Sequence, residues 1–259
     1  MLGWLRERRR NKIREEPFPG EWLEILEKNV PHYASLSPDE QAKLRGDLRI
    51  FIVEKYWEGC AGLALTDEIL VTVSAQACLL SLHLDNDYYP DVRSLFIYPH
   101  GYLAEQRSVG PAGVVTEGRI HRLGEAWSTG PVVLSWDDAR DGSLNPRDGR
   151  NVVFHEFAHQ LDMADRRSDG MPRLPDDEAY RRWIDVVTAE YEALVRRSAA
   201  GRASVLDEYG VESYAEFFAV ATEAFFERPL PLRARHQRLY ELLRDYYQQD
   251  PAARMGMGC

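Results

Sequence analysis

The stretch "HEFAH", residues 155–159, constrains this chain more than any other. It places two of the seven histidines four positions apart, with a glutamate directly after the first. In a helix, residues i and i+4 share one face, so the imidazoles of His155 and His159 can bind one metal ion together. Glu156 follows about 100° around the helix and flanks that ion without occupying the same coordination position. This is where a general base that acts on a metal-bound water lies.

The surrounding residues favour a buried helix for this motif. Apolar side chains cover its other faces: Val153, Phe154, Phe157, Ala158 and Leu161. The alternative is an exposed amphipathic helix with two ordinary histidines, but buried histidines need partners. Random shuffling of this composition would produce the pattern only roughly 0.02 times. The sequence therefore predicts a zinc site, with one Zn²⁺ per chain.

A catalytic zinc ion needs a third protein ligand, and one candidate lies close by in the sequence. Asp165 follows His159 by six residues, the position of the third ligand in H-E-x-x-H-x-x-G-x-x-H enzymes. That geometry requires the helix to end sharply three residues after His159, normally at a glycine. Asp162 occupies this position instead, and aspartate adopts the left-handed conformation less readily than glycine. The missing glycine weakens the case for Asp165.

The second candidate is Glu216, which lies within the aromatic segment "YAEFFAVATEAFF". Carboxylates are rarely buried unless they are paired or bound to metal, so Glu216 needs a partner. Glu223 lies on the same helical face and raises the same question. A salt bridge to an arginine is the alternative for either residue, and we favour it for Glu223. The residues alone leave both Asp165 and Glu216 open as the third ligand.

The order of predicted elements indicates an α+β fold, mostly helical, with a small mixed sheet beside the active-site helix. β-Branched and aromatic residues predict strands within 94–102, 118–128 and 130–136, the last two joined by a turn at 128–130. Periodicity and N-terminal capping residues predict helices over 21–29, 38–58, 69–82, 176–198 and 213–227. We interpret residues 1–16 as a basic, solvated N-terminal tail and residues 17–259 as a single domain.

Composition excludes several classes of protein. A net charge of −10 argues against direct nucleic-acid binding, which depends on lysine and arginine. The longest uncharged run, residues 69–82, is too short to span a bilayer. The N-terminus lacks the apolar run of an export signal, and an odd number of cysteines suits a reducing compartment. We therefore expect a cytoplasmic protein, although weak attraction of the basic tail to an acidic membrane surface or partner is an alternative.

Two stretches, "HEFAHQLD" and "YGVESYAEFFAVATEAFF", make the chain similar to the Mlc titration factor A family, also called DgsA anti-repressors. The resemblance covers most of residues 20–250 and includes "IYP", "GEAWSTGPVVLSW" at 124–136 and "YYQQDP" at 246–251. Those proteins look like the catalytic domain of anthrax lethal factor, a zinc metallopeptidase. The resemblance implies a zincin-like metallopeptidase domain.

Residue by residue, the resemblance makes His155, His159 and Glu216 the zinc ligands and Glu156 the general base. Tyr209 matches the tyrosine that assists the reaction by donating to the developing oxyanion. The alternative for Tyr209 is a half-buried packing residue. An extended peptide substrate could pair with the edge of the strand ending in "AWSTG" or "GPVVLSW".

The resemblance also implies weak aminopeptidase-like activity on small peptides and binding of an Mlc-type transcriptional repressor. Two hypotheses therefore stand: a zinc peptidase, or a regulatory binding protein that sequesters a repressor of sugar-uptake genes and in which the metal is secondary or structural. Some relatives have an additional histidine where this chain has Thr116, and His121 is nearby. We assign no role to these two residues, and we expect His83 and His100 to have packing or surface roles.

Overall fold

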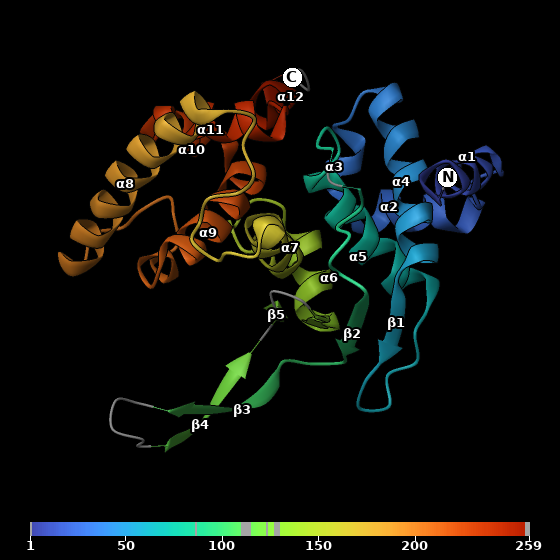
Figure 1. The fold of residues 1–259 in the computed structure, drawn as a ribbon, viewed down its shortest axis with the longest axis horizontal. Helices are drawn as coiled ribbons and strands as arrows, with labels where there is room; N and C mark the ends of the chain where they lie inside the picture. Colours follow the sequence, from blue (N-terminus) through green and yellow to red (C-terminus); the bar gives the residue numbers. More distant parts are fainter. Residues whose placement is uncertain (1, 86, 110–114, 123, 127–129, 257–259) are drawn as a thin grey trace.

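The structure is a computed structural model that describes the backbone of residues 2–85, 87–109, 115–122, 124–126 and 130–256. Side chains are described for these residues except 2, 102–126 and 256. Helices account for most of the chain, and a small sheet lies on one side of them (Figure 1). The expected α+β class is confirmed.

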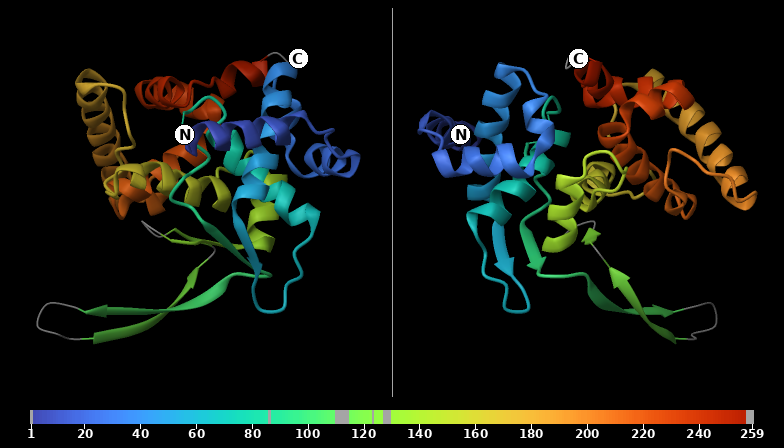
Figure 2. Two further views of the ribbon diagram at one scale, coloured as in Figure 1. Left: turned by 45° about the vertical axis from the view of Figure 1, so that its right-hand side comes forward. Right: turned by 180° about the vertical axis from the view of Figure 1, so that it is seen from behind.

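The chain up to Ser135 supplies one group of helices and all the strands of the described residues. Its elements are α1 (Leu2–Glu15), α2 (Gly20–Asn29), α3 (Pro31–Ala34), α4 (Pro38–Glu54), β1 (Tyr56–Gly59), α5 (Asp67–Leu80), β2 (Ser94–Tyr98), β3 (Tyr102–Val109), β4 (Val115–Arg122), β5 (Gly124–Ala126) and β6 (Val132–Ser135). The antiparallel pair β3–β4 extends away from the helices (Figures 1 and 2).

The second half is helical. Its elements are α6 (Trp136–Leu144), α7 (Val152–Asp162), η1 (Met163–Asp165), α8 (Asp177–Ala199), η2 (Glu208–Val211), α9 (Tyr214–Glu227), α10 (Pro229–Arg235), α11 (Gln237–Tyr247) and α12 (Pro251–Gly256). Helices α7 and α9 lie side by side near the centre of the molecule, between the sheet and the outer helices (Figures 1 and 2).

The principal sheet has the strand order β1-β2-β6-β5. The first three strands are parallel, and β5 pairs antiparallel with β6, so the sheet is mixed as predicted. Leu95 in β2 aligns with Trp57 in β1 and Val132 in β6, and both Leu95 and Val132 are fully buried. Strands β5 and β6 contact α7, which places the sheet beside the H-E-x-x-H helix.

Several predicted element boundaries were wrong. The helix expected over 38–58 ends at Glu54, because Lys55 is extended and the next four residues pair with 94–97 as β1. The segment 118–128 is divided between β4 and β5. Trp136 begins α6 instead of ending a strand, since Ser135 caps that helix by accepting from the backbone of Asp138. The predicted turn at 128–130 falls largely outside the described residues.

Residues 2–15 form α1, where a solvated tail was predicted over 1–16. Although most of α1 is exposed, Arg10 is buried and donates to Glu54 at 2.8 and 2.6 Å. It also pairs with Asp87. A buried guanidinium loses its hydration, which is unfavourable. The ion pairs with Glu54 and Asp87 compensate for this loss. Arg10, one of the basic residues that suggested a solvated tail, therefore attaches α1 to the rest of the protein. The division into a tail and a single domain over 17–259 stays a prediction.

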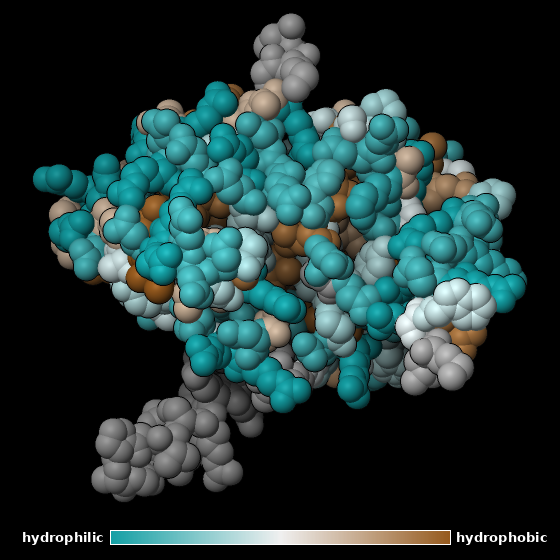
Figure 3. Space-filling model, turned by 45° about the horizontal axis from the view of Figure 1, so that its top comes forward, coloured by the Kyte–Doolittle hydropathy of each residue, from teal (hydrophilic) through white to brown (hydrophobic). Residues whose placement is uncertain are grey.

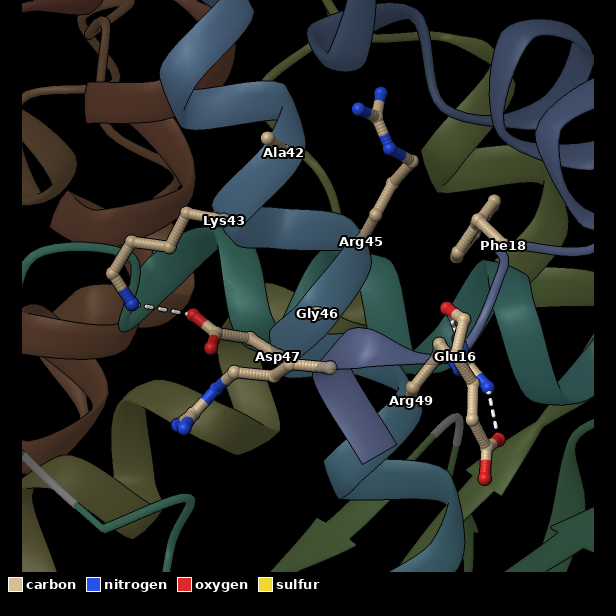
Figure 4. A pocket seen from close by; sticks show the side chains of 9 residues that line it. Glu16, Phe18, Ala42, Lys43, Arg45, Gly46, Asp47 and Arg49 are labelled. Carbon is tan, nitrogen blue, oxygen red and sulfur yellow. Dashed lines mark hydrogen bonds and ion pairs between the residues drawn. The ribbon is translucent and has the colours of Figure 1, made fainter. Parts of the chain in front are cut away.

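A groove of about 510 Å³ lies where α1 and the residues that follow it meet α4 (Figure 4). Two of its ion pairs lie across or along the groove, with Lys43 2.5 Å from Asp47 and Arg49 2.6 Å from Glu16. We interpret the groove as a packing seam that holds α1 in place.

The core follows from the apolar faces of the central helices. Phe154 of α7 lies 5.2 Å from Phe226 of α9, and Phe157 lies 5.7 Å from Phe51 of α4, measured between ring centroids. Hydrophilic residues dominate the surface in Figure 3, with hydrophobic side chains visible mainly in hollows between the helices. Among the described residues, no helix is both long and apolar enough to cross a membrane.

Candidate metal centre

The H-E-x-x-H motif lies on α7, as predicted. Asn151 caps this helix, with its side-chain oxygen accepting from the backbone N–H of Phe154 at 3.0 Å. Val153, Phe154 and Phe157 are fully buried on the faces away from the motif. This packing fixes the rotation of α7 about its axis, and so it fixes the direction in which both histidines project.

His155, His159 and Glu216 converge on one point. The His155 Nε2 atom lies 3.0 Å from Glu216 Oε2 and 3.2 Å from His159 Nε2, and His159 Nε2 lies 3.3 Å from Glu216 Oε2. Tetrahedral zinc with ligands at about 2.0–2.1 Å has ligand-to-ligand edges of about 3.3 Å. The three atoms therefore lie at nearly the separations that one zinc ion requires, and the donor set of two imidazoles and one carboxylate suits that metal.

The triad is partly open to solvent. The side chains of His155, His159 and Glu216 are 13%, 12% and 21% exposed. Burial alone would raise the pKa of Glu216, but hydrogen bonds with the two histidines outweigh burial and hold it at about 2. Glu216 is therefore an ionised carboxylate, as a metal ligand must be, and the residual exposure of the three side chains lets water reach the site.

Glu156 is buried beside the triad. Burial raises its pKa to about 7, even though the neighbouring charges of His155 and His159 act in the opposite direction. A carboxyl group whose pKa lies near neutrality can both accept and release a proton at physiological pH. This environment favours the role of general base, which stays a prediction.

The N-terminal turn of α9 presents Glu216 to α7. Ser213 caps α9 by accepting from the backbone N–H of Glu216 at 3.1 Å. In the loop after α7, Gly170 contacts the start of α9. Its φ is +73°, and a Cβ at this position would lie 2.2 Å from the carbonyl oxygen of Tyr214. Only glycine fits this contact, which ties the loop after α7 to the start of α9.

Tyr209 lies at the rim of the site. It belongs to η2, where Asp207 accepts from its backbone N–H at 3.0 Å, and the residue is 46% exposed. The ring centroids of Tyr209 and His155 are 5.9 Å apart. The tyrosine named by the resemblance is therefore close to the triad, with solvent access on its other side.

Among the side chains that the structure describes, no arginine pairs with Glu223, although we favoured such a salt bridge from the sequence. One carboxylate oxygen accepts from the backbone N–H of Asn151 at 2.7 Å, and the other lies 3.1 Å from Nδ1 of His155. Sequence reasoning missed this link between α9 and a metal-site histidine. The available signal was the spacing of Glu216, Glu223 and Glu227, which share one face of α9.

The local candidate Asp165 is not brought into the site. It lies in η1 after α7 has ended, is exposed, and accepts from the backbone N–H of Arg167 at 2.9 Å. Asp162 is fully buried and accepts from the backbone N–H groups of Gly170 at 3.1 Å and Met171 at 2.8 Å. Among the described residues, the one group able to hold a metal ion is His155, His159 and Glu216.

We predict that Asp162→Ala lowers the free energy of unfolding by about 2 kcal/mol or more, because two backbone N–H groups, one buried and one partly buried, lose their acceptor. Chemical denaturation of the metal-free protein measures this change. Asp165→Ala is the matched control, since its carboxylate is exposed and its loss should cost little. Equal stability of the two variants would contradict this role for Asp162.

Among the described side chains, His83 and His100 do not belong to this group. His83 is 3.1 Å from Glu40, and the exposed His100 pairs with Asp137, so both have the surface roles expected of them. His121 and Thr116 lie in β4, outside the residues whose side chains are described.

Comparison with known proteins gives matches over nearly the whole chain. The family described as glucose-regulated metallo-peptidase M90 matches residues 4–248. An uncharacterized protein of Synechocystis sp. is 37% identical over 244 residues, covering 94% of this chain and 89% of its own. Mlc titration factor A of Klebsiella pneumoniae is 32% identical over 228 residues, with 87% and 85% covered. The protein of that name from Escherichia fergusonii is 31% identical over 242 residues, with 90% and 88% covered.

Proposed function

Because the chain belongs to the glucose-regulated metallo-peptidase M90 family, we propose that it is a zinc-dependent, gluzincin-type peptidase with a zincin-like domain. The observation that carries this proposal is the convergence of His155, His159 and Glu216 beside the buried Glu156. Two imidazoles and one carboxylate with an open fourth position are a ligand set of catalytic zinc sites.

In the proposed reaction, His155, His159 and Glu216 hold the ion. When bound, zinc supplies Lewis acidity that polarises a peptide carbonyl and makes water more acidic. Glu156 accepts a proton from the attacking water and then delivers it to the leaving amine. Tyr209 donates a hydrogen bond to the oxygen on which negative charge develops.

We propose small peptides as substrates, cleaved in an aminopeptidase-like manner. The sheet offers a place for an extended peptide, because β5 is one of its two edge strands and contacts α7. Strand β6, the other candidate from the sequence, lies between β2 and β5 and has no free edge. A peptide added beside β5 would use main-chain hydrogen bonds and would lie next to the H-E-x-x-H helix.

The relatives named Mlc titration factor A favour a second function, which is binding of an Mlc-type transcriptional repressor in the cytoplasm. Under this alternative, zinc is secondary or structural. The two functions are compatible, because binding of a protein partner needs a surface and not an intact proton shuttle.

Two assays on the purified protein separate these functions. The first measures zinc per chain and hydrolysis of a panel of short peptides by mass spectrometry. The second measures binding of a purified Mlc-type repressor by calorimetry, with zinc-loaded and metal-free protein. Zinc-dependent cleavage supports the peptidase, whereas repressor binding without any cleavage would leave the regulatory function alone.

We predict that Tyr209→Phe lowers kcat by about 10-fold or more, with zinc content unchanged, because only a hydrogen-bond donor to the oxyanion is lost. Steady-state kinetics on the most rapidly cleaved peptide measure this effect. The phenylalanine keeps the ring, so the packing against His155 is retained. A normal kcat in Tyr209→Phe would make Tyr209 a packing residue.

A further inference from the structure

We propose that Glu223 is a positioning residue that orients His155 and directs a lone pair of its Nε2 atom toward the metal. This inference rests on the proposed zinc site and adds a residue that does not itself touch the ion. Glu223 is largely buried in the middle of α9, seven residues after Glu216.

The two carboxylate oxygens of Glu223 have separate partners. Oε1 accepts from the backbone N–H of Asn151 at 2.7 Å, and Oε2 lies 3.1 Å from Nδ1 of His155. Since a carboxylate accepts hydrogen bonds, Nδ1 of His155 is the donor in this contact. The opposite ring atom, Nε2, is the one that faces Glu216 and His159.

A histidine binds metal through an unprotonated nitrogen, and the partner of its other nitrogen decides which one this is. Glu223 holds the proton on Nδ1 and so leaves Nε2 available for the ion. The same contact restricts rotation of the imidazole ring about the bond that joins it to Cβ.

Glu223 is itself held in place. Asn151, whose backbone N–H it accepts, bonds through its side-chain amide to Oε1 of Gln76 at 2.8 Å. Gln76 lies on α5, where its own amide donates to the carbonyls of Thr72 and Ala139. The chain of bonds therefore ties the metal-site histidine to three helices and to the N-terminal cap of α7. Such a buried and connected carboxylate has little freedom to move away from His155.

Substitution by glutamine separates this role from simple packing. In Glu223→Gln, the backbone N–H of Asn151 would need the side-chain oxygen of the new amide, which leaves the NH₂ group of that amide facing His155. That group donates to Nδ1 and favours the proton on Nε2, where it competes with the metal. We expect Glu223→Gln to weaken zinc binding by about 10- to 100-fold.

Glu227 provides a matched control on the same face of α9. It is buried and accepts from the backbone N–H of Gly149 at 3.0 Å, but it has no contact with a metal-site histidine in the described structure. Burial raises its pKa to about 9, so the glutamine of Glu227→Gln resembles the protonated acid that it replaces. We expect this variant to bind zinc as the wild type does.

The test measures the zinc dissociation constant of the full chain by competition with a chromophoric chelator, together with the melting temperature of each metal-free protein. The expected result is weaker zinc binding in Glu223→Gln alone, with metal-free melting temperatures close to that of the wild type. Glu223→Asp keeps a carboxylate and should recover part of the affinity.

Three outcomes overturn the inference. They are unchanged zinc affinity in Glu223→Gln, equal losses in Glu223→Gln and Glu227→Gln, or failure of metal-free Glu223→Gln to fold, which would make Glu223 a packing residue. A wild type that binds no zinc would instead contradict the proposed function, so the two failures are distinguishable.

Discussion

Replacing Glu216 with alanine will abolish stoichiometric zinc binding, whereas replacing Asp165 with alanine will leave about one zinc ion per chain. Glu216 Oε2 lies within 3.3 Å of both histidine Nε2 atoms, so Glu216→Ala leaves a site with two protein ligands. Affinity should fall by more than about 100-fold, which exceeds the typical cost of losing a residue that only supports a ligand. Asp165 is exposed and lies outside the site, where its carboxylate accepts from the backbone N–H of Arg167.

We would measure the zinc content of both purified variants by mass spectrometry after dialysis at neutral pH. This measurement decides whether Glu216 or Asp165 is the third ligand. Circular dichroism controls for folding, because Glu216 also lies in the first turn of α9. Full zinc in Glu216→Ala with loss in Asp165→Ala would reverse our assignment of the third ligand.

Replacing Glu156 with glutamine will reduce peptide hydrolysis by at least about 10²-fold and will leave zinc binding intact. The amide has nearly the same shape as the acid but cannot accept a proton from water. Burial raises the pKa of Glu156 to about 7, so the native group can exchange a proton near neutral pH, which the glutamine cannot. The metal ligands themselves are unchanged.

The comparison requires wild type and Glu156→Gln at equal zinc content and equal peptide concentration. Repressor binding, if the chain has this function, should be the same for both proteins. Undiminished turnover in the zinc-loaded variant would exclude Glu156 as the proton shuttle.

The candidate metal site could be found from the sequence, because two features of the sequence point to it: the spacing of the histidines and a carboxylate among apolar residues. The spacing of His155 and His159 indicates that they share one helical face. The position of Glu216 among phenylalanines indicates a buried carboxylate, which needs a partner. The missing glycine at Asp162 argued against Asp165, and the structure places Asp165 away from the site. The resemblance to the Mlc titration factor A family is confirmed by the family match and by the named relatives.

Other features depend on contacts that sequence spacing does not contain. The partner of Glu223 is an imidazole 68 residues away, and a charge pattern alone cannot distinguish it from an arginine. The strand β1 follows α4 after a single residue, and it forms because β2 offers hydrogen bonds from a distant part of the chain. The helix α1 is likewise anchored by Glu54 and Asp87, far from Arg10 in sequence.

The most direct test of the zinc-peptidase assignment is a zinc titration of the metal-free protein with peptide cleavage as the readout. Zinc is removed with a chelator, the chelator is dialysed away, and zinc is returned in steps while the initial rate is measured. We expect no cleavage without metal and a rate that rises linearly to a maximum at one zinc ion per chain. Cleavage that persists without zinc, or no cleavage at one bound zinc ion per chain across the peptide panel, would contradict the assignment.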